Sequence, residues 1–176
     1  MSLKYALLGQ LARGPQTGYG LAKSFASSLN YAWSASRSQI YPELARLLDE
    51  GMIRQTASGP RGSKVYETTP KGLSELRHWL RETEPDRGGR NELLLRIFLL
   101  WLLERDEAGA YLRREKELLE LELEELEAIA EEDDPQTPAE QAAALALEHG
   151  LRSLRSRIGW VEWAMAEVAA WPAAGQ

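Results

Sequence analysis

One stretch of the chain, residues 36–72, limits the possible folds more than any other part. Its sequence is SRSQIYPELARLLDEGMIRQTASGPRGSKVYETTPKG. The first part has apolar residues at the spacing of one helical face, and Gly51 after it is a typical helix stop. Two strand-like runs follow with a Gly/Pro turn between them, and a second helical pattern comes next. Helix, strand, turn, strand and helix in this order are typical of the second half of a winged helix-turn-helix.

The first helix of this stretch can begin at either of two caps. Ser36 together with Gln39 fits a capping box, and Ser38 is an equally good N-cap. Pro42 favours a start near Ser38, because its missing N–H then leaves only the carbonyl of the cap without a partner. The apolar face that such a helix buries consists of Ile40, Leu44, Leu47 and Leu48.

The polar residues that open this helix point away from its apolar face. In helix-turn-helix proteins the N-terminal residues of the second helix meet base edges, and Gln and Arg have the geometry that suits adenine and guanine. A solvated first turn with good caps would have the same composition, so this turn alone does not identify a DNA-binding protein. The candidate DNA contacts are Arg37, Ser38, Gln39 and Tyr41.

The hairpin after the helix carries further basic residues. Its predicted strands are Met52–Ala57 and Ser63–Thr69, and residues 58–62 form the turn. A basic hairpin beside a recognition helix is placed to touch phosphates or the minor groove, although a basic hairpin alone is usually only surface. The candidate contacts here are Arg54, Arg61 and Lys64.

Helical patterns also lie before and after this region. An amphipathic run with leucine at every fourth position stops at Gly14-Pro15, and Thr17 can cap a second helix. After the hairpin, Thr69-Pro70 supplies an N-cap and an N1 proline for another helix. We therefore expect a mainly α-helical protein whose residues 1–81 form a winged helix-turn-helix of three helices and a two-stranded wing.

The charge of the chain is unevenly distributed. The formal net charge is −6, from 21 Lys+Arg and 27 Asp+Glu in 176 residues. Residues 1–90 hold 13 Lys+Arg and 8 Asp+Glu, a net of 13 − 8 = +5, and residues 91–176 hold the other 8 and 19, a net of 8 − 19 = −11. The basic half contains the predicted helix and wing, so the asymmetry indicates separate tasks for the two halves.

The second half is predicted to be a helical domain. Residues 82–91, ETEPDRGGRN, read as a linker, and residues 92–103 are apolar on nearly every side, which predicts a helix buried all round. Leu112, Leu119 and Leu126 then recur at seven-residue intervals, at coiled-coil spacing. The glutamates beside this seam are most simply a solvated face, and they would also keep DNA away from it.

A last helix begins at Thr137 and continues almost to the C-terminus. Thr137-Pro138-Ala139-Glu140 provides an N-cap, an N1 proline and a capping-box glutamate. A helix of roughly 30 residues would be about 45 Å long, so its apolar stripe needs a partner. We expect residues 92–171 to form a dimerisation and possible effector-binding domain, with dimer contacts from Leu112, Leu119, Leu126, Leu154, Ile158, Val161 and Met165.

Five segments together resemble the N-terminal pattern of the PadR family of bacterial transcriptional regulators. The resemblance covers nearly all of residues 3–80, and it implies a winged-helix DNA-binding domain, dimerisation through C-terminal helices and repression that a small molecule relieves. The segments are Leu3–Gly9 (LKYALLG), Thr17–Leu21 (TGYGL), Ser38–Leu44 (SQIYPEL), Leu48 with Glu50–Ile53 (EGMI), and Tyr66–Gly72 (YETTPKG).

The second half is weakly similar to the larger subfamily, which has several C-terminal helices. The similarity runs from Leu93 onward and again over Gly150–Trp163. In that subfamily two protomers clasp each other through these helices. A two-fold dimer implies a pseudo-palindromic operator in double-stranded DNA, with half-sites roughly 34 Å apart or a multiple of that distance.

The tryptophans of the second half suggest where an effector could bind. Four of the six tryptophans lie there, and flat aromatic effectors could stack on such rings. Aromatic residues at helical spacing are more often dimer core, and a lone arginine in an apolar helix usually pairs with a carboxylate. With these alternatives open, the candidate effector contacts are Arg96, Trp101 and Trp160.

Several functional classes lack the residues that they require. The chain has no cysteine, its two histidines stand alone, and no phosphate loop is present, so we expect no enzyme, no cofactor and no metal site. No signal peptide or run long enough to span a bilayer is recognisable, which predicts a cytoplasmic protein without membrane contact. Two alternatives remain, a winged-helix module that binds protein and a small-molecule sensor without operator-specific DNA binding. Arg37, Arg54, Arg61 and Lys64 weigh against the first.

Overall fold

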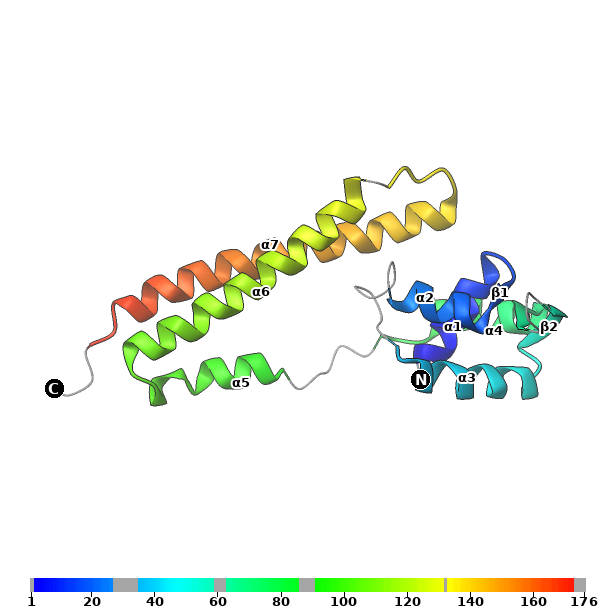
Figure 1. Ribbon diagram of the computed structural model, residues 1–176, viewed down its shortest axis with the longest axis horizontal. Coiled ribbons are helices and arrows are strands. Elements are labelled where there is room, and N and C mark those ends of the chain that lie inside the picture. Colours follow the sequence, from blue (N-terminus) through cyan, green and yellow to red (C-terminus); the bar gives the residue numbers. More distant parts are fainter. Residues whose placement is uncertain (1, 27–34, 59–62, 86–90, 132, 173–176) are drawn as a thin grey trace. The chain divides into compact units, whose positions relative to one another are not determined.

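The computed structural model consists of two compact units, residues 1–85 and 86–176 (Figure 1). It describes residues 2–26, 35–58, 63–85, 91–131 and 133–172. The boundary between the units falls inside the segment that the sequence predicts as a linker. The predicted wing residue Arg61 lies outside the described residues.

The N-terminal unit has the predicted winged-helix architecture. Its antiparallel sheet has the order β1-β3-β2, so the wing strands β2 and β3 pair with each other and β3 also pairs with β1. The two-residue strand β1 was not predicted. The elements are α1 (Ser2–Ala12), β1 (Gln16–Thr17), α2 (Gly18–Ala26), α3 (Arg37–Asp49), β2 (Ile53–Ser58), β3 (Lys64–Thr68) and α4 (Pro70–Glu82).

The core of this unit joins the first three helices to the base of the wing. Leucines of α1, the apolar faces of α2 and α3, and the first residue of β2 pack together with almost no exposure to solvent. Such burial is the main source of stability in a small domain. The fully buried side chains include Leu7, Leu8, Leu21, Phe25, Ile40, Leu44, Leu47 and Ile53.

The recognition helix α3 begins two residues earlier than the favoured prediction. Ser36 is the N-cap, and Gln39 completes the capping box. Pro42 is tolerated because the carbonyl that lacks its N–H partner belongs to Ser38, which is exposed to water. The helix ends as predicted at Gly51, where φ is +68° and the N–H groups of Gly51 and Met52 donate to carbonyls of the last turn.

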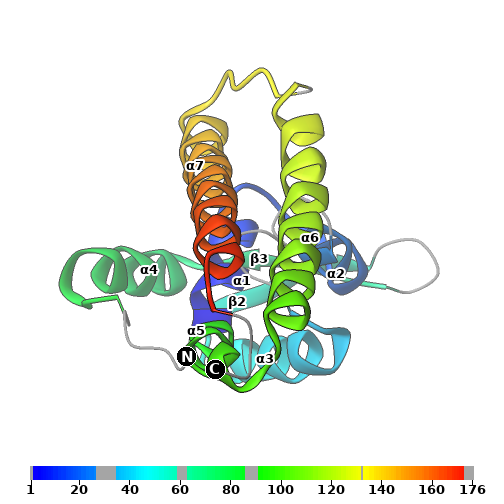
Figure 2. The same cartoon turned by 90° about the vertical axis from the view of Figure 1, so that its left-hand side faces the viewer.

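The C-terminal unit is built on two long helices that lie side by side (Figures 1 and 2). Thr137 and Glu140 form the predicted capping box at the start of the second of them. The unit contains α5 (Glu92–Phe98), the 3-10 helix η2 (Leu100–Leu102), α6 (Arg105–Glu131) and α7 (Pro138–Ala169).

The predicted leucine seam of α6 packs against α7 of the same chain. Leu112, Leu119 and Leu126 are 0%, 2% and 7% exposed, and Leu154 and Val161 of α7 are buried with them. Coiled-coil spacing therefore describes an antiparallel pair within one protomer. The surface open to a second copy must lie mainly elsewhere.

The acidic rim of α6 is partly paired with basic residues of α7. Arg155 lies 2.7 Å from Glu127, and Lys116 of α6 lies 2.7 Å from Glu162 of α7. Arg157 approaches Glu115 at 3.5 Å. These pairs are partly exposed and add little to the stability that the buried seam supplies, but they show that some of the glutamates on the rim contact α7.

The prediction of a helix buried all round at residues 92–103 is wrong for the single chain. None of the residues of α5 is buried, and Leu100 is the only buried residue of the 3-10 helix η2. Large apolar side chains instead face solvent on α5, on η2 and next to them. We call this set the α5 apolar face: Leu94, Leu95, Phe98, Leu99, Trp101, Leu102 and Leu103.

Candidate DNA-binding surface

The first turn of α3 is held by its own side chains. The Ser36 backbone N–H donates to Oε1 of Gln39 at 3.0 Å, and the Ser36 hydroxyl lies 3.0 Å from the same oxygen. The hydroxyls of Ser36 and Ser38 are 2.8 Å apart. All three residues are exposed. They form a rigid, polar start to the helix, and their hydrogen bonds are already committed to it.

This network changes the role expected for Gln39. A bidentate contact to adenine uses both the oxygen and the NH₂ group of the amide, but the oxygen already accepts from Ser36. We therefore expect Gln39→Ala to cost the N-terminal unit about 1 kcal/mol through loss of the cap. Urea unfolding would measure this cost. Unchanged stability with a loss of sequence preference would instead support a base contact.

The start of α2 lies directly against α3. A Cβ atom at Gly18 would stand 2.8 Å from Cε1 of Tyr41 and 3.5 Å from Cδ1 of Leu44, so any other residue there would displace the Tyr41 ring. The N–H of Gly20 donates to the Thr17 hydroxyl at 3.0 Å, which caps α2 as predicted. Tyr41 remains 48% exposed beside α2. Gly18 thus allows α2 to lie close to the part of α3 that carries Tyr41.

Tyr19 is a surface residue that the sequence analysis missed. Its side chain is 60% exposed, and its ring lies under the guanidinium of Arg37, with Cζ 5.4 Å from the ring centroid. This is within the range of a cation–π contact. The two residues are 18 positions apart, and only the packing of α2 against α3 brings them together. The only signal in the sequence was an aromatic residue in the first turn of the helix that Thr17 caps.

The basic residues of the wing are not equivalent. Arg54 on β2 forms an ion pair with Glu67 on β3, directly opposite in the sheet. Lys64 is exposed near the tip of the wing, opposite Ser58 in the sheet, and has no ion-pair partner among the described residues. Of these two predicted contacts, Lys64 is therefore the one whose charge is free to meet a phosphate.

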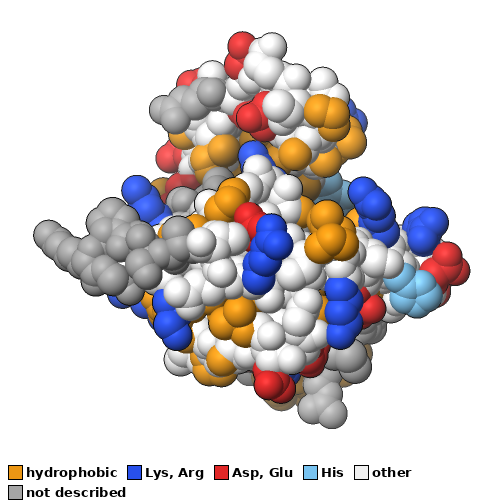
Figure 3. All heavy atoms as spheres, turned by 90° about the vertical axis from the view of Figure 1, so that its right-hand side faces the viewer, with side chains coloured by type: hydrophobic (Ala, Val, Ile, Leu, Met, Phe, Trp, Pro, Cys, Tyr) orange, Lys and Arg blue, Asp and Glu red, His pale blue; other side chains and the backbone are white. Residues whose placement is uncertain are grey.

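The other edge of α3 carries paired charges. Arg46 forms ion pairs with Glu43 and Glu50 along the helix, and its pKa is raised above the usual value chiefly by the hydrogen bond that it donates to Glu43. In Figure 3, Lys and Arg side chains are spread among uncharged atoms over the visible face rather than gathered in one patch. The described residues of this face therefore form no continuous basic patch.

An ion network ties the back of the unit together. The Lys4 ammonium of α1 lies 3.0 Å from a carboxylate oxygen of Glu75 on α4 and 4.0 Å from Glu50. The Tyr5 hydroxyl donates to Glu75 at 3.1 Å, and its ring stacks on Trp79 with centroids 4.3 Å apart. These contacts hold α4 and the end of α3 against α1.

The same network determines the ionisation of Glu75. The hydrogen bond that Lys4 donates to Glu75 is the main cause of a lowered pKa for this carboxyl. The hydrogen bond from the Tyr5 hydroxyl lowers the pKa further. A carboxyl with a lowered pKa stabilises the fold above its unfolded pKa and loses this contribution as the pH falls through its folded pKa. The contribution is screened because Glu75 is only partly buried.

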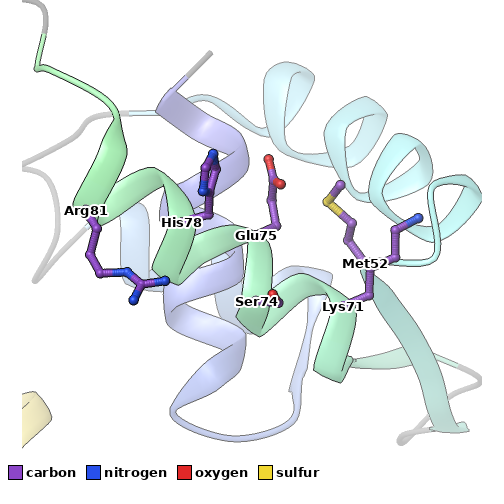
Figure 4. A pocket seen from close by; sticks show the side chains of 6 residues that line it. All are labelled: Met52, Lys71, Ser74, Glu75, His78 and Arg81. Carbon is purple, nitrogen blue, oxygen red and sulfur yellow. The ribbon is translucent and has the colours of Figure 1, made fainter.

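A shallow hollow follows one side of α4 (Figure 4). Its volume is about 440 Å³, and the side chains of Glu75 and His78 project into it from the same side of the helix. It contains none of the predicted DNA contacts. The lining residues are Met52, Lys71, Ser74, Glu75, His78 and Arg81.

The predicted effector residues do not form one site. Trp160 lines a cavity of about 360 Å³ that also contains Asn91, Leu94 and Arg157. Trp101 lines a separate cavity of about 290 Å³ with Trp171 and is itself 68% exposed. Arg96 lines neither of them and pairs with Glu92 at 2.6 Å.

Other kinds of site leave no trace in the described part of the chain. No group of three or more His, Asp or Glu side chains there could hold a metal ion. None of the described helices is both long and apolar enough to cross a bilayer.

Comparison with known proteins gives consistent matches to one group. Residues 7–78 match the model of the transcriptional regulator PadR-like family, and residues 89–169 match that of the virulence activator alpha C-terminal region. The negative transcriptional regulator PadR of Bacillus subtilis is 34% identical over 177 residues, which covers 94% of this chain and 97% of that protein.

Solved structures agree with these matches. The crystal structure of Bacillus subtilis PadR in complex with operator DNA has a TM-score of 0.85 and 32% identity, covering 96% of this chain and 99% of that one. The complex of the same protein with p-coumaric acid has a TM-score of 0.84 and 30% identity, with the same coverage.

Proposed function

Since the chain belongs to the PadR-like family of transcriptional regulators, we propose that this DNA-binding regulator is a homodimeric repressor that a small molecule releases from a pseudo-palindromic operator. Like its relatives it regulates transcription, and it acts in the cytoplasm without catalysing a reaction. We expect it to repress transcription, because the similar Bacillus subtilis protein is a negative transcriptional regulator.

The observation that carries this proposal is the exposed, pre-formed N-terminus of α3 beside the wing. Its first turn is capped by Ser36 and Gln39 and is therefore rigid before DNA binds. Arg37 and Tyr41 flank it on the side of α2, and Lys64 stands near the tip of the wing. A helix N-terminus for the major groove and a basic wing for the backbone are the parts that a winged helix needs.

We assign the dimer contact to the α5 apolar face. Phe98, Trp101 and Leu102 are 76%, 68% and 63% exposed, and exposed apolar patches of this kind mark interaction surfaces. Ile158 and Met165 of α7, which the sequence analysis also named, are only partly buried and remain available. A second copy would cover this surface and place two recognition helices on one duplex.

We assign the effector to the cavity beside Trp160. It combines apolar walls from Leu94 and Val161 with the amide of Asn91 and with the guanidinium of Arg157, which would exchange its loose pairing with Glu115 for a small aromatic carboxylate. p-Coumaric acid is the first compound to test, because the similar Bacillus subtilis protein has been crystallised with it. Quenching of tryptophan fluorescence that is absent in Trp160→Phe would support this site.

The proposed function is tested by fluorescence anisotropy with the DNA upstream of the chain's own coding region. A scrambled duplex of equal length is the control, and both are measured at two salt concentrations. A preference of roughly a thousandfold, with salt-sensitive affinity, is expected for a specific regulator. Equal and weak binding to both duplexes would contradict the proposal for this DNA, and a random-sequence selection would then decide whether any operator exists.

Lys64 should act through phosphate alone. Lys64→Ala is expected to weaken binding to the specific and the scrambled duplex alike and to lower the salt slope by about one ion. Anisotropy titrations over a salt series measure both effects. A loss confined to the specific duplex would show instead that Lys64 reads sequence.

A further inference from the structure

Arg37, the first residue of α3, is held by a residue of the neighbouring helix. Its guanidinium lies over the ring of Tyr19 from the start of α2, 5.4 Å from the centroid. We propose that Tyr19 is a positioning residue that aims Arg37 at the major-groove edge of a guanine, so that this pair supplies a sequence-specific contact. The inference rests on the proposed function, because it presumes that α3 enters an operator.

The other polar side chains of the first turn are less free to read a base. The oxygen of Gln39 accepts from Ser36, and the hydroxyl of Ser38 is bonded to that of Ser36. Arg37 is exposed and has no carboxylate partner among the described residues. It is thus the one charged side chain of this turn, and no ion pair engages its fork of donors in the described part of the chain, whereas Gln39 keeps its NH₂ group but has its oxygen occupied.

The other arginines near this surface are already engaged. Arg46 is paired with Glu43 and Glu50, and Arg54 with Glu67. Using either for a base contact would first require breaking an ion pair. Of these three described arginines, Arg37 is therefore the one that can make a bidentate contact to a base without first breaking an ion pair.

The cation–π contact favours a base over a phosphate. A free arginine samples many rotamers and meets the backbone wherever charge attracts it, whereas a guanidinium held over an aromatic ring samples fewer orientations. The fork then matches O6 and N7 of guanine, the commonest specific contact of arginine. Position also fits, because the opening residues of a recognition helix are the ones that reach base edges.

Tyr19 is suited to such a role because the fold does not depend on it. The side chain is 60% exposed and belongs to no buried cluster, whereas Leu21 and Phe25 of the same helix form the core. Removing the ring therefore opens no cavity. A variant at this position should fold normally and report on Arg37 alone.

The test uses the full chain and a duplex that it selects from a random pool. Each guanine of the selected site is replaced in turn by 7-deazaguanine, which lacks the N7 acceptor. We expect the wild-type chain to lose affinity roughly tenfold at one guanine in each half-site. Arg37→Ala should bind the unmodified site about tenfold more weakly and show no further loss on that substitution.

The variants of Tyr19 distinguish positioning from a structural role. Tyr19→Ala should lose most of the 7-deazaguanine sensitivity with an unchanged unfolding midpoint, while Tyr19→Phe keeps the ring and should retain the sensitivity. Arg37→Lys keeps the charge without the fork and should lose the sensitivity while its salt slope stays unchanged. Lys64→Ala is the matched control for loss of a cation, and it should retain the sensitivity.

Two kinds of failure can be separated. If the pool yields a defined site but no guanine is sensitive, or if Arg37→Ala or Tyr19→Ala retains the wild-type sensitivity, the inference is overturned and the proposed function stands. If the chain selects no sequence at all, the proposed operator binding fails, and the inference fails with it.

Discussion

Introducing two carboxylates into the α5 apolar face, as Phe98→Glu with Leu102→Glu, should convert the protein from a dimer into a monomer of 19.8 kDa. Phe98 and Leu102 are 76% and 63% exposed in the single chain. The substitutions should therefore change the stability of the single chain little. A second copy could cover this surface only by burying unpaired carboxylates, which is strongly unfavourable. Light scattering after size exclusion would measure the mass directly.

The same variant should lose specific DNA binding by at least about a hundredfold. Two linked recognition helices bind two half-sites with an effective concentration that a monomer lacks, and such linkage contributes factors of roughly 10² to 10⁴. Binding to scrambled DNA should fall much less, because it depends mainly on the charges of each N-terminal unit.

Leu80→Glu is the matched control for this experiment. Leu80 is 67% exposed on α4 of the N-terminal unit, away from the α5 apolar face in the sequence and in a different unit. It should leave the mass and the operator affinity unchanged. A wild-type chain that is already a monomer, or a double variant that remains a dimer, would refute the assignment of the dimer surface to α5.

The sequence predicted best those features that depend on interactions between residues a few positions apart, such as the ends of helices. Thr69 with Pro70, Thr137 with Glu140, and Gly51 were each recognised as a helix boundary and act as such in the structure. Capping depends on atoms within one turn, so a short sequence contains all the information needed. The family motifs spread over residues 3–80 extended this local reading to the correct fold.

The parts that were missed depend on partners that are distant in sequence. Heptad spacing identified the seam at Leu119 but could not tell whether α7 of the same chain or another copy would cover it. The contact between Tyr19 and Arg37 depends on the packing of α2 against α3. The apolar segment that contains Phe98 was read as a buried helix, because composition does not distinguish a helix covered by its own chain from one left for a partner.

Gly72→Ala is expected to have the largest effect on folding of any single substitution in the N-terminal unit that we consider. A Cβ atom at Gly72 would lie 2.2 Å from the carbonyl oxygen of Met52, 2.9 Å from Cγ2 of Thr68 and 3.1 Å from Cδ2 of Leu8. The first of these is a backbone atom and cannot rotate away. Space for one methyl group therefore requires α4 to move off the base of the wing.

Such a movement would also break the cap of α4. The Met52 carbonyl that meets the new methyl group accepts the backbone N–H of Thr69 and the Thr69 hydroxyl, each at 3.0 Å. The same hydroxyl accepts a hydrogen bond from the N–H of Gly72 at 3.2 Å. The clash of the new methyl group with Met52 would therefore disturb the hydrogen bonds that cap α4. Overpacking alone typically costs 1–3 kcal/mol, and with the lost cap we expect about 3 kcal/mol or more.

Gly9→Ala provides the matched control within the same unit. Nothing lies within 4 Å of a Cβ atom at Gly9, which is inside α1, so alanine there should raise stability by about 0.5–1 kcal/mol. Urea unfolding followed by far-ultraviolet circular dichroism would give both values. Because α6 and α7 belong to the other unit, Gly72→Ala should abolish operator binding while the protein remains a dimer. If Gly72→Ala instead unfolded at the wild-type urea concentration, the close packing of α4 on Met52 would be refuted, and with it the view that this glycine holds the wing against α1.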